Sequence, residues 1–380
     1  MPFGLYVHIP FCLSKCYYCD FNSYAGCADL VEPYLNQLED EAAYYGRDPR
    51  VADRMVATIF VGGGTPTILS PAQLERVGRL LQDRFRLTPN VEWTVEANPK
   101  TLSLEKLQTL RAMGVNRLSL GVQAMDDRLL RAIGRVHSVD DVAEQVRLVR
   151  AAGFANLSLD LIYGLPEQSL ADWERTLEAA LRLEPEHISA YGLKVEDDTP
   201  FAAAQAAGTL ELPGEDHEVA MYRLCQSVLL AAGFEQYEIS NFALPGRECQ
   251  HNLLYWGNHE YLGLGAGAYS FLNHHRFAHE RSLTEYLKRW QEEKRPPISE
   301  DELLSPELER AETVFLGLRR RSGISDGEFS RRFGHSLFTA YGEEIDRLMR
   351  QQLLERCGDS IRLTETGLMV SNQVFMEFLP

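Results

Sequence analysis

Basic charge is scarce in this chain of 380 residues. Lysine and arginine together number 38, against 55 aspartate and glutamate residues, which gives a formal net charge of -17. Proteins that bind nucleic acid do so through clustered lysine and arginine, and the sequence contains no such cluster. The composition therefore predicts that nucleic acid is not a partner.

Long apolar runs and paired cysteines are also missing. No segment approaches the roughly 18 consecutive apolar residues of a membrane-spanning helix. The first residues, MPFGLYVHIPFC, lack the basic start and apolar stretch of a secretion signal, so we expect a cytoplasmic protein. The 7 cysteines are an odd number and are spread unevenly, unlike the disulfide framework of a secreted domain. In a reducing compartment, clustered cysteines indicate a metal centre.

Strand-like and helix-like segments alternate through the first half of the chain. Helical periodicity marks residues 71–85 and 140–153, which lie between apolar segments of strand length. The six strand-like segments are 4–9, 57–63, 91–97, 117–123, 156–164 and 187–193. Alternating βα units predict an α/β fold with a parallel sheet. Six successive units favour a partial (β/α)6 barrel, and a doubly wound open sheet is the alternative.

The pattern changes after residue 200. We expect a helix over 215–232 and a strand over 236–242. The glycine-rich segment 263–270 is either a tight βα joint or a place where the backbone approaches a ligand. From about residue 300 the sequence indicates a small, mostly helical C-terminal domain with a hairpin near 362–370. The predicted domains are a barrel with its extension, residues 1–300, and a C-terminal domain, residues 301–380.

Three cysteines cluster near the start of the chain. Cys12, Cys16 and Cys19 give the spacing C-x3-C-x2-C, and the position two residues further on is Phe21. Thiolates select zinc or iron–sulfur clusters, and structural zinc needs four protein ligands. The candidates for a fourth ligand are His8, Cys27, Cys225, Cys249 and Cys357. A [4Fe–4S] cluster on three cysteines leaves one iron open to a small molecule, and we favour it over a zinc-stabilised scaffold because no second C-x2-C pair recurs.

Polar and glycine residues gather at the ends of the predicted strands. The turn VGGGTPT, residues 61–67, offers bare backbone groups after the second strand. Polar side chains lie in or close the next strands: Glu96, Gln123 and Asp160 in the third, fourth and fifth strands, and Arg135 in the loop after the fourth. Ligands of βα barrels bind at the C-terminal ends of the strands, so these residues predict one pocket.

The cysteine spacing and the GGGTP turn together resemble the radical S-adenosylmethionine (SAM) superfamily. YVHIPFC, FVGGGTPT, VEANP, LGVQ, DLIYGLP and ETVFLGLR are similar to the oxygen-independent coproporphyrinogen oxidase-like branch, along essentially the whole chain. The resemblance implies that Cys12, Cys16 and Cys19 hold a [4Fe–4S] cluster whose open iron binds SAM. The positions implied to contact SAM or flank the cluster are Tyr6, Tyr18, Gly63, Gly64, Thr65, Glu96, Gln123, Arg135 and Asp160.

Two activities occur within this branch. Coproporphyrinogen III dehydrogenases, which decarboxylate their substrate oxidatively, carry an N-terminal extension and a further cysteine where this chain has Phe21. Haem chaperones of the HemW type carry H-N-x-x-Y-W, and residues 251–256 read HNLLYW. The resemblance therefore implies a haem chaperone with acceptor haemoproteins as partners, and the dehydrogenase is the alternative. It is also compatible with a homodimer and with peripheral contact to a membrane.

The motif HNLLYW supplies the candidate haem site. His251 is the candidate haem-iron ligand because a neutral imidazole binds haem iron, and Asn252, Tyr255 and Trp256 would frame the macrocycle. The alternative is that His251 is a loop histidine bound to a backbone carbonyl, with the two aromatic residues as ordinary packing. The implied cofactors are thus a [4Fe–4S] cluster, SAM and haem.

Overall fold

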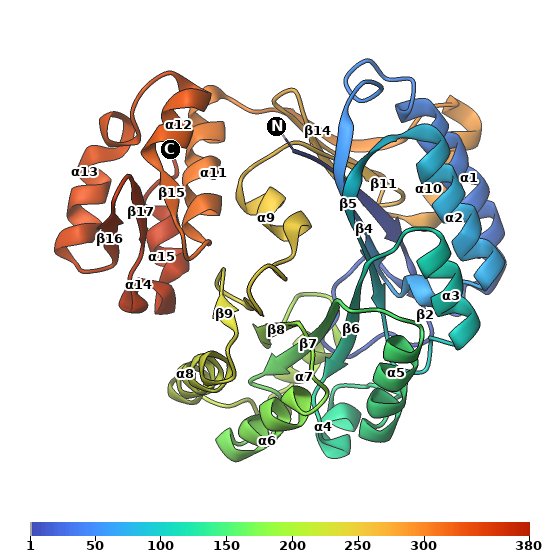
Figure 1. The fold of residues 1–380 in the computed structure, drawn as a ribbon, viewed down its shortest axis with the longest axis horizontal. Coiled ribbons are helices and arrows are strands. Elements are labelled where there is room, and N and C mark those ends of the chain that lie inside the picture. The colour runs from blue at the N-terminus through green and yellow to red at the C-terminus, as the bar shows by residue number, and fades with distance from the viewer. Residues whose placement is uncertain (1) are drawn as a thin grey trace.

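The computed structural model describes residues 2–380 and is built on one large twisted sheet (Figure 1). Six parallel strands lie side by side in chain order: β1 (Phe3–Ile9), β4 (Met55–Gly63), β5 (Arg86–Ala97), β6 (Arg117–Gln123), β7 (Leu157–Tyr163) and β8 (His187–Gly192). The predicted strands are therefore confirmed, although β5 begins at Arg86 and not at residue 91. Because the order contains no switch point, the sheet is a partial barrel and not a doubly wound sheet.

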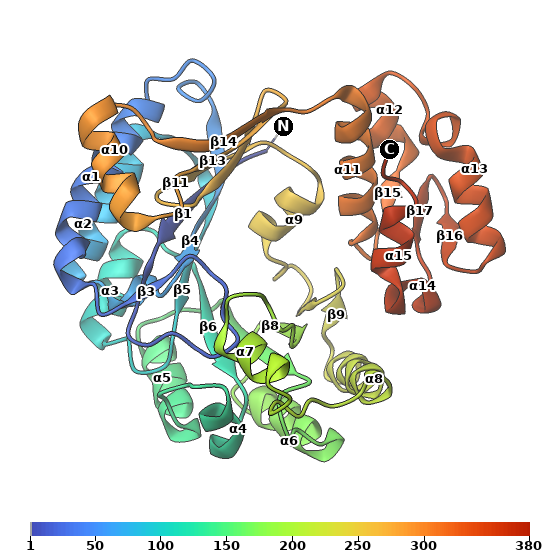
Figure 2. The same cartoon turned by 180° about the vertical axis from the view of Figure 1, so that it is seen from behind.

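Helices cover the convex face of this sheet (Figures 1 and 2). They are α1 (Val31–Tyr45), α2 (Pro71–Arg84), α3 (Leu104–Ala112), α4 (Asp127–Ala132), α5 (Val139–Ala151) and α6 (Leu170–Leu181). Capping boxes start α2, α5 and α6, since Ser70, Ser138 and Ser169 each accept a hydrogen bond from the backbone three residues on. The helices predicted over 71–85 and 140–153 are confirmed as α2 and α5.

The two faces of β6 differ in character although the whole strand is buried. Its outward residues Leu118, Leu120 and Val122 join the hydrophobic core. Its inward residues Ser119, Gly121 and Gln123 line a cavity on the concave side. A strand presents alternate residues to opposite faces, so the sequence RLSLGVQ places apolar groups under the helices and polar groups inside the barrel.

Short strands extend the sheet at both edges. Beyond β1 lie β11 (Tyr261–Leu264), β12 (Tyr269–Leu272), β13 (His275–His279) and β14 (Ile298–Leu303), and beyond β8 lie β10 (Asn241–Ala243) and β9 (Glu235–Gln236). The segment 263–270 is therefore the turn of a hairpin, with Gly265 and Gly267 at φ +97° and +74°, so the tight βα joint, one of the two alternatives, is wrong.

The strand predicted over 236–242 is also wrong, because the chain turns between β9 and β10. The carboxylate of Glu238 accepts hydrogen bonds from the Ser240 backbone at 2.8 Å and from Asn241 Nδ2 at 2.5 Å. These local contacts replace the ladder hydrogen bonds of a continuous strand. The preceding helix is confirmed as α8 (Glu215–Ala231).

Three further helices complete the barrel region: α7 (Pro200–Ala206), α9 (Gln250–Trp256) and α10 (Leu283–Glu293). In Figures 1 and 2, α9 lies on the concave side of the sheet, between the barrel and the C-terminal elements. It touches β1 and β4 on one side and α11 (Pro306–Leu318) on the other. From residue 2 to residue 380, no helix is both long and apolar enough to cross a membrane.

The C-terminal elements surround a hydrophobic cluster of their own. They comprise α11, β15 (Ile324–Ser325), α12 (Asp326–Phe333), α13 (Leu337–Arg350), β16 (Leu354–Cys357), β17 (Ser360–Leu363), α14 (Glu365–Met369) and α15 (Ser371–Met376). The hairpin is β16–β17, earlier than the predicted 362–370. Residues 365–369 are helical because the Thr364 hydroxyl accepts a hydrogen bond from the Gly367 backbone and caps α14.

Candidate cofactor-binding site

The predicted cluster and SAM residues converge on one cavity at the C-terminal ends of the barrel strands. Its lining includes Cys12, Cys16, Tyr18, Cys19, Gly63, Gly64, Glu96, Gln123, Arg135 and Asp160. Two predicted residues lie elsewhere. Thr65 is buried behind the cysteine loop, and Tyr6 lines an adjoining cavity.

The three cysteines follow β1 and are all free thiols: Cys12 ends the two-residue strand β2 (Phe11–Cys12), and Cys16 and Cys19 lie on the loop after it. Cys12 Sγ lies 3.6 Å from Thr65 Oγ1, and Arg135 Nη1 donates to Cys16 Sγ at 3.3 Å. In residues 2–380, no three histidine, cysteine or acidic side chains converge as the ligands of one metal ion. A structural zinc site needs four protein ligands, whereas a cubane cluster with one open iron needs three thiolates, each on a different iron atom. Three free thiols on one short segment fit such a cluster.

The glycine turn after β4 contacts the cysteine loop directly. The backbone amides of Gly64 and Thr65 donate to the carbonyls of Ile9 and Phe11 at 2.9 and 2.8 Å. A Cβ on Gly64 would lie 2.6 Å from the Phe11 carbonyl oxygen. Only glycine permits this approach, so the turn forms the wall of the cavity beside the cluster loop.

Two carboxylates face the cavity from β5 and β7. Burial, and after it the charge of Asp160, raises the pKa of Glu96 to about 7. Burial also raises the pKa of Asp160, whose oxygens accept from Ser119 Oγ at 2.9 and 3.1 Å. Burying two acids side by side is costly unless a donor or cation joins them. The ammonium group and ribose hydroxyls of SAM supply such donors, so these residues fit SAM.

Arg135 connects the cysteine loop to the strand ends. Besides Cys16, its guanidinium donates to Asn98 Oδ1 at 2.5 Å and to the Gly121 carbonyl, and Asn98 Nδ2 donates to Thr65 Oγ1 at 2.6 Å. A Cβ on Gly121 would lie 2.6 Å from Asn98 Oδ1. Arg135 Nε is buried and has no hydrogen-bond partner within residues 2–380.

Sequence reasoning missed Asn98, Ser119 and Gly121, which line the same cavity. The signal was present as spacing. Asn98 follows Glu96 by two positions, and Ser119, Gly121 and Gln123 are successive residues two positions apart. Residues two apart on a strand share a face. Gln123 itself was predicted, but its left-handed backbone, φ +68°, could not be read from the sequence.

His251 lies on α9 and is buried, with both ring nitrogens engaged. Nδ1 lies 2.8 Å from Thr58 Oγ1, and Nε2 lies 3.0 Å from the Tyr255 hydroxyl. Burial, with a smaller contribution from Arg117, lowers the pKa of His251 to about 3, so the imidazole is neutral. The partners are hydroxyls of a strand and a helix residue, not the backbone carbonyl of the alternative interpretation.

The other motif residues separate into two groups. Tyr255 lines a second cavity, and Asn252 and Trp256 are partly buried away from it. The Arg319 guanidinium lies 4.3 Å from the centroid of the Trp256 ring. HNLLYW therefore joins the cavity at Tyr255 to the C-terminal elements at Trp256.

The second cavity has a volume of about 610 Å³ and shares Phe21, Gly63 and Glu96 with the first. It lies between the cysteine loop, the concave face of the sheet extension and α9. Its aromatic lining consists of Tyr6, Phe21, Tyr255, Tyr261 and Tyr269. Five aromatic rings around one cavity are suited to a large, planar, mostly apolar ligand.

Comparisons with known proteins agree with this geometry. Residues 6–180 match the model of the radical SAM superfamily, and residues 304–370 match that of the HemN C-terminal domain. The chain is 40% identical over 378 residues to "Heme chaperone HemW" of Bacillus subtilis (strain 168), covering 98% of both chains. It is 32% identical to "Heme chaperone HemW" of Escherichia coli (strain K12), covering 100% of this chain and 98% of the relative.

Among solved structures, coproporphyrinogen III oxidase (HemN) from Escherichia coli, described as a radical SAM enzyme, has a TM-score of 0.86 at 26% identity. The alignment covers 99% of this chain and 90% of that one. The predicted partial radical SAM barrel with a C-terminal domain is thereby confirmed.

Proposed function

Because this chain belongs to the HemN-like family of radical SAM proteins, with full-length relatives named heme chaperone HemW, we propose that it is a haem chaperone. It holds a [4Fe–4S] cluster and SAM, binds haem, and passes haem to acceptor haemoproteins. The observation that carries the proposal is the position of HNLLYW, on a helix inside the barrel with Tyr255 lining a cavity beside the cofactor pocket.

In this proposal Cys12, Cys16 and Cys19 hold the cluster. The residues assigned to SAM and to the surroundings of the cluster are Tyr6, Tyr18, Gly63, Gly64, Thr65, Glu96, Gln123, Arg135 and Asp160. When bound, the cluster can supply an electron to the sulfonium of SAM. The protein's own contribution is to orient SAM and the cluster loop. Glu96 and Asp160 accept hydrogen bonds from SAM, and Arg135 donates both to Cys16 and to the Gly121 carbonyl near the end of β6.

His251 is proposed as the haem-iron ligand. Its imidazole is already neutral, which ligation requires, so no proton has to leave before iron binds. Nε2 must exchange the Tyr255 hydroxyl for iron, and the Tyr255 side chain must therefore move when haem arrives. Asn252 and Trp256 lie on the same helix, and the Trp256 ring packs against the Arg319 guanidinium.

The likeness to HemN favours one other candidate, oxygen-independent coproporphyrinogen III dehydrogenase. Against it stands Phe21, an exposed side chain at the mouth of both cavities where that enzyme group has a further cysteine. An apolar ring at this position cannot provide thiol chemistry.

The test uses anaerobically reconstituted protein in two assays. Loaded with haem and mixed with an apo-haemoprotein, it should transfer haem, seen as the Soret band of the acceptor. Supplied with coproporphyrinogen III, SAM and a reductant, it should release no carbon dioxide. Decarboxylation with matching 5′-deoxyadenosine, and no transfer of haem, would establish the dehydrogenase instead.

A further inference from the structure

We propose that the second cavity seats the haem macrocycle, with Arg281 at its mouth as the partner of a propionate. This inference rests on the proposed haem-chaperone function and assigns its binding site. The cavity combines a volume of about 610 Å³, an aromatic wall and a single arginine among its lining residues. A tetrapyrrole has a matching combination of a flat apolar ring and carboxylates at one edge.

Two of the five aromatic side chains that line the cavity are strongly exposed to solvent. Phe21 is 61% exposed and Tyr269 is 44% exposed, and both line the cavity. Tyr6, Tyr255 and Tyr261 are partly buried and form its inner surface. Aromatic side chains gathered around a cavity and left uncovered indicate a surface that a ligand completes.

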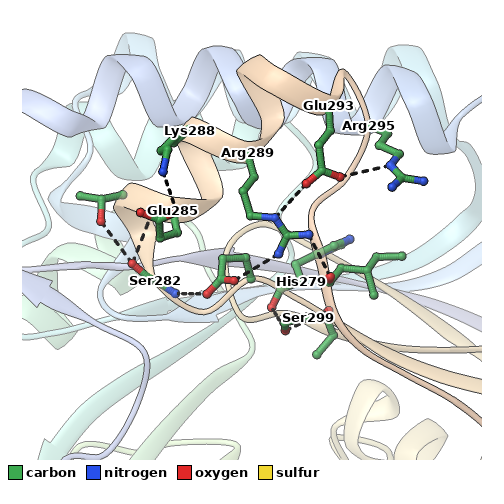
Figure 3. A network of polar contacts seen from close by, with 12 residues as sticks. His279, Ser282, Glu285, Lys288, Arg289, Glu293, Arg295 and Ser299 are labelled. Carbon is green, nitrogen blue, oxygen red and sulfur yellow. Dashed lines mark hydrogen bonds and ion pairs between the residues drawn. The ribbon is translucent and has the colours of Figure 1, made fainter.

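Arg281 is available for a carboxylate, unlike the charged residues that follow it in the chain. Its Nη2 donates to the backbone carbonyl of Asp20 at 2.9 Å, and no ion pair involves it within residues 2–380. Figure 3 shows two arginines that are paired: Arg289 on α10 contacts Glu293 at 2.9 Å, and Arg295, just beyond the helix, contacts the same carboxylate at 3.2 Å. Arg281 therefore retains donors that a ligand can use.

The position of Arg281 is fixed by the cysteine loop. Its own carbonyl accepts hydrogen bonds from Asn22 Nδ2 at 2.9 Å and from the Tyr24 hydroxyl at 3.2 Å. With the Arg281 guanidinium held at the mouth of the second cavity, the edge of the macrocycle that carries the propionates faces outward. The apolar part of the macrocycle then enters toward Tyr255, whose hydroxyl covers His251 Nε2.

Charge complementarity favours this orientation over the reverse. The acidic residues of the lining are Asp20, Glu96 and Glu300, and the Glu300 carboxylate accepts from the Tyr269 hydroxyl at 2.9 Å. Glu96 lies at the inner end shared with the cofactor pocket. A propionate at the inner end would lie beside Glu96 with no arginine of the lining near it, whereas one beside Arg281 meets a cation.

The test measures binding of metal-free protoporphyrin IX by fluorescence, so that iron ligation does not contribute. Each protein is titrated with the free diacid and with its dimethyl ester. Arg281→Gln should weaken diacid binding about threefold to tenfold and leave ester binding unchanged. Arg281→Lys should recover part of the loss because it restores the charge. Tyr269→Ala should weaken binding of both porphyrins about threefold or more.

Matched controls lie outside the cavity. Arg295→Gln removes a charge from an exposed arginine, and Tyr44→Ala removes an aromatic ring that is 45% exposed. Both should bind porphyrin like the wild type, and circular dichroism checks that every variant is folded.

The possible results separate the two claims. If the wild type binds neither haem nor porphyrin saturably, the proposed function falls. If the wild type binds both ligands but Arg281→Gln and Tyr269→Ala bind like the controls, the cavity assignment falls and the function stands. Haem binding without porphyrin binding, or an equal effect of Arg281→Gln on diacid and ester, would also overturn the assignment.

Discussion

At the scale of single residues, glycine decides how closely the glycine turn after β4 can approach β1. Gly63 has φ +105°, and a Cβ on it would lie 2.4 Å from the ring of His8. That ring is held by hydrogen bonds to the Tyr6 hydroxyl at 3.0 Å and to the Asn22 carbonyl at 2.7 Å. Moving it would therefore break contacts among residues that line the second cavity.

Gly63→Ala should destabilise the protein by about 2–4 kcal/mol, because it adds a clash to the cost of a left-handed alanine. Gly26→Ala is the matched control, since Gly26 has φ +77° but nothing within 4 Å of the added Cβ. That variant should lose only about 1 kcal/mol. Urea unfolding measures both, and equal losses would show that the contact with His8 is unimportant.

Because of Glu96, the free energy of unfolding should fall as the pH rises toward neutrality. Burial raises its pKa from 4.5 to about 7, so between these values the folded chain holds a proton that the unfolded chain has lost. The free energy of unfolding from this group therefore falls as pH rises through this range, by about 3 kcal/mol at most. Urea unfolding of cofactor-free protein at several pH values measures the slope.

Glu96→Gln should flatten that part of the profile. Glu75→Gln, which changes an exposed carboxylate on α2, should leave the profile as it is in the wild type. An unchanged slope in Glu96→Gln would show that Glu96 is already ionised in the folded protein.

At the scale of elements, α9 is held from two sides. From the barrel, the Glu92 carboxylate accepts from the His251 backbone amide at 3.0 Å. From the C-terminal side, Arg332 donates to the Asn258 carbonyl just beyond the helix at 2.8 Å, while it pairs with the buried Glu309 at 2.8 Å. Helix α9 thus takes its position from both parts of the chain.

Arg332→Met should lower the free energy of unfolding by about 2–4 kcal/mol, because the buried Glu309 loses an ion-pair partner. It should also speed the release of bound haem, because the hydrogen bond to the Asn258 carbonyl that holds the end of α9 is lost. The adjacent Arg331→Met is the control, since within residues 2–380 the Arg331 side chain donates only to the Gly327 carbonyl of its own helix. Denaturation and stopped-flow haem release measure the two effects. Equal haem release from both variants would show that the C-terminal elements do not influence α9.

The regular elements were predictable because each follows from a local pattern. RLSLGVQ alternates apolar and polar residues and became β6 with its predicted bounds, 117–123. The strand predicted over 236–242 failed because Glu238 turns its side chain back to its own backbone. A polar side chain that competes with the ladder is not visible in an apolar pattern.

At the scale of the whole molecule, the cofactor pocket was largely predictable and the second cavity was not. Cys12, Gly63 and Glu96 occur in recognisable motifs at or just after the C-terminal ends of barrel strands, so their convergence could be expected. Phe21, Tyr255 and Arg281 come from a loop, a helix and a hairpin end that only the tertiary fold brings together. Neither the spacing nor the type of these residues predicts such a cavity, because the residues that line it lie far apart along the chain.

The haem-chaperone account is tested most directly by titrating anaerobically reconstituted protein with haem and following the Soret band. The wild type should saturate at one haem per chain, and so should His217→Ala, which changes an exposed histidine on α8. His251→Ala should bind more weakly and with an altered Soret maximum, because the proposed iron ligand is gone. Weak, unsaturating binding by all three proteins would contradict the account, and saturation with the same spectrum in His251→Ala would remove His251 as the ligand.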